Sequence, residues 1–191
     1  MKKALLIYGS PRKDGNTDIL LKEIVRGIKD GDEKINVEEI YLRKLCIFPC
    51  RECRSCEVSG RCVVDDDMQK LYPKLKDADY IILGSPIFFY SVSAQTKALI
   101  DRAQALWARK YLLGQDKKKK EKRQGWFVAV GATKGKKLFE GSIFTLKYFF
   151  DALNISLAGE LLIRGVDGKG EVLNYPEHLS RAYKLGKEMV S

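Results

Sequence analysis

The chain has 191 residues, 45% of them hydrophobic, so it is long enough and apolar enough to bury a core. Its formal net charge is +10, from 35 basic and 25 acidic residues. No apolar run approaches the roughly 20 residues of a membrane-spanning helix, and the short apolar stretch after Lys3 lacks the features of a signal peptide, so we expect a cytoplasmic protein.

Apolar runs and helical periodicity alternate along the chain, which predicts alternating strands and helices. The predicted strands are 3–8, 36–42, 80–83, 126–130 and 155–163. The predicted helices are 17–29, 66–76, 95–112, 142–153 and 176–189. Five strands that are each followed by a helix indicate an α/β fold, a parallel sheet covered on both faces in the flavodoxin-like order 2-1-3-4-5. We expect residues 1–191 to form a single domain whose ligand lies beyond the carboxyl ends of the strands.

The loop after the first predicted strand has the residues that a phosphate site needs. It reads GSPRKDGNT (residues 9–17) and leads into a helix. Its glycines permit close backbone approach, its polar side chains supply donors, and the helix N-terminus favours an anion. The loop matches neither the ATP-binding P-loop nor the dinucleotide-binding pattern. A polar, capped turn is the alternative interpretation.

Two further loops follow predicted strands at the same edge of the sheet. GSPIFFYSVS (residues 84–93) places three aromatic residues in a row, and a planar flavin ring needs apolar and aromatic flanks. We expect one of Phe88 and Phe89 to be in the core instead. The third loop, residues 131–135, is small enough to lie against the edge of such a ring.

Together, GSPRKDGNT, GSPIFFYSVSAQTKALIDR and VAVGAT resemble the three FMN loops of the NADPH-dependent FMN reductase and flavodoxin-like family. The resemblance covers nearly the whole chain and implies FMN as a cofactor. It implies that the FMN phosphate is held by Ser10, Arg12, Asn16 and Thr17. It implies that the ribityl chain and ring are lined by Pro86, Ile87, Phe88, Phe89 and Tyr90, and that the site is closed by Gly131, Ala132 and Thr133. Asp101 and Arg102 match the family's "iDR" and are interpreted as structural.

All five cysteines lie between positions 46 and 62, which in an intracellular chain favours a metal site over disulfides. Cys50, Cys53, Cys56 and Cys62 have the spacing C-x2-C-x2-C-x5-C. Three thiolates at every third position can converge on a [4Fe–4S] cluster, whereas structural zinc usually takes two separated pairs. Zinc, a reactive thiol pair and cysteines without metal remain as alternatives.

This cysteine motif combined with the FMN loops resembles the archaeal and bacterial iron–sulfur flavoproteins. The resemblance implies that Cys50, Cys53, Cys56 and Cys62 ligate the cluster from a loop at residues 46–64. Gly60 would turn the chain back toward Cys62, and Cys46 is expected to be a buried thiol. Three arginines between the ligands would either offset the charge of the cluster or face water; they are Arg51, Arg54 and Arg61.

The leading interpretation is a redox-active electron-transfer flavoprotein, which passes electrons between a one-electron carrier such as ferredoxin, the [4Fe–4S] cluster and FMN. The alternative is an NAD(P)H-dependent FMN or quinone reductase without a functional cluster. Basic runs at residues 117–123 and 134–137 would suit a nicotinamide cofactor or an acidic carrier equally, or would be solvated loops.

Two other classes of function are disfavoured. A nucleic-acid-binding module lacks a recognisable nucleic-acid-binding fold in this chain. His178 is the only histidine, which excludes a two-histidine metal site. The family resemblance implies a homodimer or higher homo-oligomer.

Overall fold

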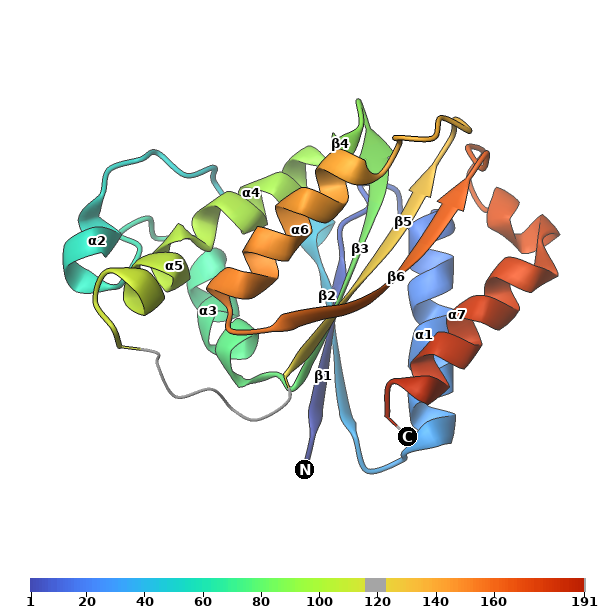
Figure 1. Ribbon diagram of the computed structural model, residues 1–191, viewed down its shortest axis with the longest axis horizontal. Helices are drawn as coiled ribbons and strands as arrows, with labels where there is room; N and C mark the ends of the chain where they lie inside the picture. Colours follow the sequence, from blue (N-terminus) through green and yellow to red (C-terminus); the bar gives the residue numbers. More distant parts are fainter. Residues whose placement is uncertain (116–122, 191) are drawn as a thin grey trace.

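Five parallel strands form the central sheet, in the order β2-β1-β3-β5-β6 (Figure 1). The computed structural model describes residues 1–115 and 123–190. The strands are β1 (Lys3–Tyr8), β2 (Asn36–Tyr41), β3 (Tyr80–Phe88), β5 (Gln124–Gly131) and β6 (Ser156–Arg164). Numbered by the parallel strands alone, this is the order 2-1-3-4-5, so the predicted flavodoxin-like topology is confirmed. A short strand that was not predicted, β4 (Ser91–Val92), folds back antiparallel onto the end of β3.

Helices cover both faces of the sheet, as the alternating pattern predicted (Figure 1). One face carries α1 (Asn16–Gly31) and α7 (Pro176–Glu188), which lie side by side. The other face carries α3 (Met68–Asp77), α4 (Ala94–Arg102), α5 (Gln104–Tyr111) and α6 (Glu140–Ala152). The short helix α2 (Ser55–Ser59) belongs to the cysteine segment, and 3-10 turns occur at Leu42–Lys44 and Glu171–Asn174. Within the described ranges, the helices are too short or too polar to cross a membrane.

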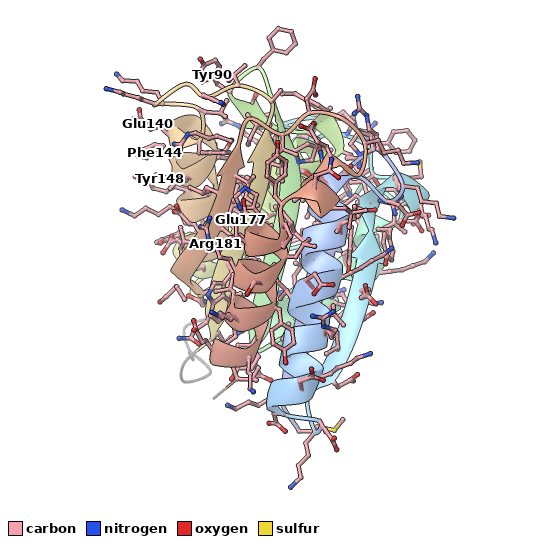
Figure 2. All side chains as sticks on the ribbon, turned by 90° about the vertical axis from the view of Figure 1, so that its right-hand side faces the viewer. Tyr90, Glu140, Phe144, Tyr148, Glu177 and Arg181 are labelled. Atoms are coloured by element: carbon pink, nitrogen blue, oxygen red, sulfur yellow. The ribbon has the colours of Figure 1, made fainter. Side chains whose placement is uncertain are left out.

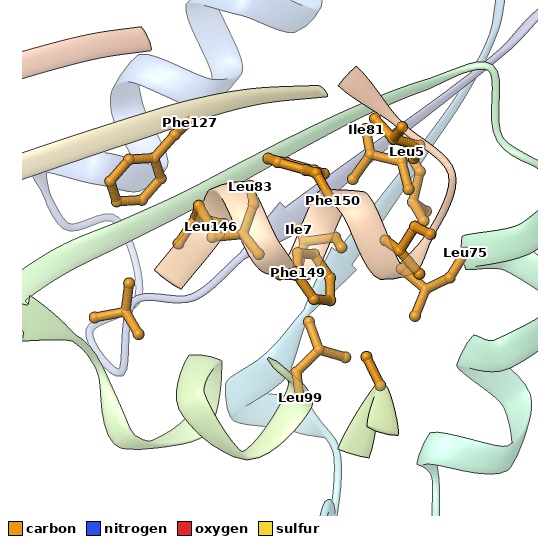
Figure 3. Packing of buried hydrophobic residues seen from close by; sticks show 14 of the residues in the cluster. Leu5, Ile7, Leu75, Ile81, Leu83, Leu99, Phe127, Leu146, Phe149 and Phe150 are labelled. Carbon is orange, nitrogen blue, oxygen red and sulfur yellow. The ribbon is translucent and has the colours of Figure 1, made fainter. Parts of the chain in front are cut away.

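Two layers of buried apolar side chains, one on each face of the sheet, hold these helices in place. Successive strand residues point to opposite faces. Leu5 and Ile7 of β1 therefore pack with α3, α4, α5 and α6, while Leu6 and Tyr8 pack with α1 and α7. Figure 3 shows the first of these layers around Leu83, a fully buried residue. Full burial of one such side chain stabilises the fold by about 1.5–3 kcal/mol.

The predicted helix 95–112 is two helices in the structure. α4 ends at Arg102 and α5 begins at Gln104, with Ala103 between them. The Arg102 carbonyl accepts a hydrogen bond from the Tyr72 hydroxyl (2.8 Å), and Leu106 N–H bonds to Ala103 O, three residues back, rather than to Arg102 O. This tighter turn changes the direction of the chain between α4 and α5. α5 then contacts α2 of the cysteine segment.

Arg123, grouped in the sequence with the first lysine run, is a buried structural residue. Its guanidinium donates to the carbonyls of Ala78 (2.7 Å), Leu153 (2.7 Å) and Leu75 (2.6 Å). These carbonyls lie at the C-terminal ends of α3 and α6, where helices leave acceptors without partners. The interpretation of Arg123 as part of a solvated cationic loop is therefore wrong. Lys117, Lys118, Lys119, Lys120 and Lys122 lie outside the described residues.

Candidate functional site

The ends of β1 and β3 approach each other closely where the first predicted loop begins. Gly9 N–H donates to Gly84 O (2.7 Å), and the Ser93 hydroxyl at the N-terminus of α4 donates to Gly9 O (2.6 Å). A Cβ at position 9 would lie 2.6 Å from Gly84 O and 2.1 Å from the Thr96 hydroxyl oxygen. Only glycine fits there, so the loop is anchored to the neighbouring strand through its backbone.

A cavity of about 150 Å³ lies beyond the carboxyl ends of the strands. The three predicted loops and a fourth segment after β6 all contribute to it. Its lining residues are Ser10, Pro11, Arg12, Gly15, Asn16, Thr17, Pro86, Ile87, Phe88, Val130, Ala132, Val166, Asp167 and Lys169. The structure thus brings together most of the residues that the sequence assigned to one nucleotide site. The cavity is not lined by Phe89, Tyr90, Gly131 or Thr133, although each lies within two residues of a lining residue in the chain.

The fourth segment, residues 166–169, was missed by the sequence analysis. The signal was present, because Gly165, Gly168 and Gly170 surround Lys169 directly after the fifth parallel strand. Asn16 holds this segment: its amide nitrogen donates to Gly168 O (2.9 Å), and its amide oxygen accepts from Val172 N–H (3.1 Å). Both polar groups of the Asn16 side chain are therefore engaged by the protein itself.

A buried ion pair supports the first loop. Asp18, whose side chain is 1% exposed, lies 2.9 Å from the Arg43 guanidinium and accepts a hydrogen bond from Asp14 N–H (3.1 Å). Arg43 also donates to Ser10 O (3.3 Å). Burial raises the pKa of Asp18, and the charge of Arg43 opposes that shift. The pair fixes the shape of the loop. Within the loop, the Ser10 hydroxyl oxygen also accepts a hydrogen bond from Arg12 N–H (3.1 Å).

The aromatic loop forms the turn between β3 and β4 and is exposed. Phe88 is 44% exposed and Phe89 is 103% exposed, so the expectation that one of them belongs to the core is wrong. Phe89 (φ 49°) and Tyr90 (φ 60°) are both left-handed, as a two-residue hairpin turn of type I′ requires. This conformation costs roughly 1–2 kcal/mol per non-glycine residue. Figure 2 shows Tyr90 at the end of the molecule above the start of α6.

The start of the cysteine segment is held by two acidic residues that directly precede α3. Asp66 accepts a hydrogen bond from Phe48 N–H (2.9 Å), and Asp67 accepts one from Cys46 N–H (2.9 Å). Burial alone would raise the pKa of Asp66, but hydrogen bonds from Arg102 and from two backbone N–H groups hold that pKa below its usual value. The segment therefore leaves and rejoins the fold at one place.

Arg102, at the end of α4, closes this clamp. Its side chain is fully buried and makes a bidentate ion pair with Asp66, at 2.6 Å and 3.1 Å. It also donates to the carbonyls of Phe48 (2.9 Å) and Val64 (3.2 Å). These contacts agree with the structural interpretation of Arg102, while Asp101 forms a surface pair with Lys97 (2.7 Å).

The four spaced cysteines line one side of a large cavity of about 750 Å³. Cys50, Cys53, Cys56 and Cys62 line it from the cysteine segment, and residues of α4, α5 and α6 form the opposite wall, with Phe144 and Tyr148 on α6 (Figure 2). Within the described residues, no set of three or more His, Cys, Asp or Glu has metal-binding geometry. The four thiols therefore line the cavity without converging on one point. Burial raises the pKa of Cys56, and the other three thiols raise it further.

The backbone between the cysteines is bent at non-glycine positions. Glu52 (φ 51°) and Arg54 (φ 59°) are left-handed, which is costly for residues with a Cβ. Gly60 (φ 68°) ends α2, so the turn expected before Cys62 is present. Strain of this kind persists where the surroundings or a ligand determine the local shape.

Cys46 differs from the expectation. It is exposed rather than buried, and it does not line the cavity of the other four thiols. Its backbone N–H bonds to the Asp67 carboxylate, while its side chain lies at the surface. Arg51, Arg54 and Arg61 are all exposed, and Arg51 and Arg54 also line the cysteine cavity, so both alternatives for these arginines stay open.

Comparisons with known proteins identify a family and several relatives of this chain. A family model described as NADPH-dependent FMN reductase matches residues 2–141. An iron–sulfur flavoprotein of Methanocaldococcus jannaschii is 43% identical over 104 residues, which are 54% of this chain and 53% of that protein. The chain spans about half the length of the other iron–sulfur flavoproteins most similar to it.

Two further similarities extend over nearly the whole chain. A Bacillus subtilis protein named as an NAD(P)H-dependent FMN-containing oxidoreductase is 28% identical over 186 residues, 97% of each chain. An archaeal flavodoxin structure superposes with a TM-score of 0.56 and 15% identity, covering 98% of this chain and 96% of the flavodoxin. At that identity the likeness shows the fold alone.

Proposed function

The chain belongs to the NADPH-dependent FMN reductase family, and from this we propose that it is a redox flavoprotein with FMN at the carboxyl ends of its strands. The cavity lined by the four loops would take the phosphate end of FMN. Arg12 and Lys169 supply positive charge, and the start of α1 supplies backbone donors. Because this cavity is smaller than typical mononucleotide pockets, the ring would extend over the exposed aromatic turn.

We further propose that Cys50, Cys53, Cys56 and Cys62 hold a [4Fe–4S] cluster. The donor set fits the group, since four thiols of suitable spacing border one cavity on a segment clamped at both ends. The names of the iron–sulfur flavoprotein relatives support the same assignment. When bound, the cluster would supply one-electron chemistry and FMN would link it to two-electron chemistry.

The proposed activity is electron transfer with a one-electron carrier such as ferredoxin. The observation that carries it is that four thiols with cluster-type spacing line one cavity, since a protein that accepts only hydride has no need of them. The second candidate is an NAD(P)H-dependent FMN or quinone reductase without a functional cluster. It is favoured by the whole-length similarity to the Bacillus subtilis oxidoreductase and by the cations Arg12 and Lys169 at the cavity.

Anaerobic purification followed by counts of iron, acid-labile sulfide, zinc and flavin per chain tests the proposal. We expect about four iron, four sulfide and one FMN per chain. Zinc without iron would refute the cluster, and FMN without either metal would favour the second candidate.

A pair of cysteine variants tests the ligand assignment. Cys62→Ala should lose iron and the broad visible absorption while it keeps FMN, because Cys62 lines the cysteine cavity and does not line the nucleotide cavity. Cys46→Ala is the matched control and should keep its iron, since Cys46 does not line that cavity. The reverse result would require a new ligand set.

A further inference from the structure

The guanidinium of Arg102 is a fully buried charge beside the cysteine cavity. Its two terminal nitrogens are engaged by the Asp66 carboxylate and by the carbonyls of Phe48 and Val64. Arg102 also lines the cavity that the four thiols border. The Arg102 side chain therefore holds both ends of the cysteine segment and also lies at the cavity that the four thiols line.

The third nitrogen of this guanidinium, Nε, is buried and has no hydrogen-bond partner in the described structure. A buried donor without a partner is rare and costs about 1–3 kcal/mol, or more when it belongs to a charged group. Arg102 and the Cys62 thiol are also close enough for an electrostatic interaction. We therefore expect a group bound in the cavity to accept the hydrogen bond from Arg102 Nε–H.

We propose that Arg102 tunes the proposed cluster, with its Nε–H donating to a sulfur of the cluster or to the Cys62 thiolate, and with its charge favouring the reduced form. This inference rests on the cluster assigned under the proposed function. Hydrogen bonds to sulfur and local charge are principal determinants of iron–sulfur potentials. Reduction adds negative charge, so a buried cation nearby raises the midpoint potential.

A purely structural role is the competing explanation, because the clamp on Phe48 and Val64 by itself accounts for the burial of Arg102. That role predicts loss of iron on mutation, but no change in the potential of the cluster that is retained. The potential therefore separates the two explanations.

The first test is an EPR-monitored redox titration of Arg102→Lys, which keeps the positive charge but removes Nε–H. We expect the ratio of reduced to oxidised cluster, measured at the parent's midpoint potential, to fall on the order of tenfold in the variant. For one electron, this corresponds to a midpoint potential that is lower by about 59 mV. Arg181→Gln, which removes an exposed cation on α7 (Figure 2), is the control and should leave the midpoint unchanged.

The second test does not depend on the folding of any Arg102 variant. Pulsed EPR of the reduced parent protein, grown with ¹⁵N-arginine, should show coupling between the cluster and one ¹⁵N nucleus. That coupling should persist when the exposed arginines 51, 54 and 61 are all replaced by lysine.

The outcomes distinguish the inference from the function on which it rests. An iron-free parent would overturn both. A parent that contains iron but shows no ¹⁵N coupling, or an Arg102→Lys cluster with the parent's midpoint, would overturn the proposed hydrogen bond from Arg102 Nε–H to sulfur and leave the cluster assignment standing.

Discussion

Arg12 is the residue on which the phosphate assignment depends most directly. It lines the nucleotide cavity, and its guanidinium approaches Asp167 O (3.5 Å) on the loop that the sequence analysis missed. Arg12→Ala should weaken FMN binding by about 1.5–3 kcal/mol, roughly 10- to 150-fold in Kd, because a charge-assisted hydrogen bond is lost. Titration of the apoprotein by flavin fluorescence measures this.

Lys13→Ala is the matched control for that experiment. Lys13 is an exposed cation one residue away that does not line the cavity, so its loss changes the net charge equally. Equal weakening in both variants would mean that general attraction, and not a contact with the phosphate, holds the flavin.

Gly9 tests the close approach of β1 and β3. Gly9→Ala should lower the free energy of unfolding by about 1–3 kcal/mol or more, because the added Cβ meets the Gly84 carbonyl, which is backbone and cannot rotate away. FMN binding should weaken as well, since the first loop starts at this residue. Chemical denaturation and flavin titration report the two effects. Gly135→Ala, at a more open position, should cost little stability, and equal losses would contradict the steric argument.

Single residues also show where sequence reasoning stops. The predicted exposure of Arg123 and the predicted burial of Cys46 were both wrong. Each was inferred from the character of the neighbouring residues in the sequence, and a single side chain can differ from its neighbours. The burial of Arg123 depends on carbonyls from α3 and α6 that only the tertiary fold brings together. The exposed Cys46 has its backbone held by Asp67, which is 21 residues further along the chain.

Among the elements, the central strands β1, β3 and β5 were predicted well because burial on both faces leaves continuous apolar runs. The break at Ala103 was not predictable, since it depends on the Tyr72 hydroxyl from another helix. The loop after β6 was missed because its glycines and Lys169 alone do not say which ligand they face. Its place at the cavity comes from the Asn16 amide, which holds it from the opposite end of the chain.

The cysteine segment behaves as one clamped element, and Asp66→Asn tests the clamp. Breaking a buried ion pair should cost about 3–5 kcal/mol of unfolding free energy near neutral pH. The pKa of Asp66 is held below its usual value, so its stabilisation is present above the ordinary aspartate pKa of about 3.9 and is lost as pH falls through the lowered pKa. The difference in stability between parent and variant should therefore narrow in acid.

Urea unfolding of the parent and of Asp66→Asn between pH 3 and 7 measures this difference. Asp65→Asn, an exposed neighbour, is the control and should follow the parent at every pH. If the difference in unfolding free energy between the parent and Asp66→Asn stayed constant from pH 3 to 7, the charge of Asp66 would not be what stabilises the segment.

At the scale of the whole molecule, α4 connects the two cavities, which share no lining residue in the described structure. Ser93 at its N-terminus bonds to Gly9 O, and Arg102 at its C-terminus clamps the cysteine segment. Its nine residues span about 13 Å. A rigid helix of this length sets the separation between the flavin loops and the thiols within one chain.

The net charge of +10 gives the last prediction, which concerns the electron donor. Reduced ferredoxin, an acidic one-electron carrier, should reduce the protein faster than NADPH does. That rate should fall by tenfold or more from low to high salt, because screening removes electrostatic steering. Stopped-flow absorbance at several ionic strengths measures both rates. Dithionite at constant ionic strength is the control for intrinsic reducibility. Rapid, saturable reduction of FMN by NADPH in Cys62→Ala would instead identify the chain as a hydride-accepting reductase that works without its cluster.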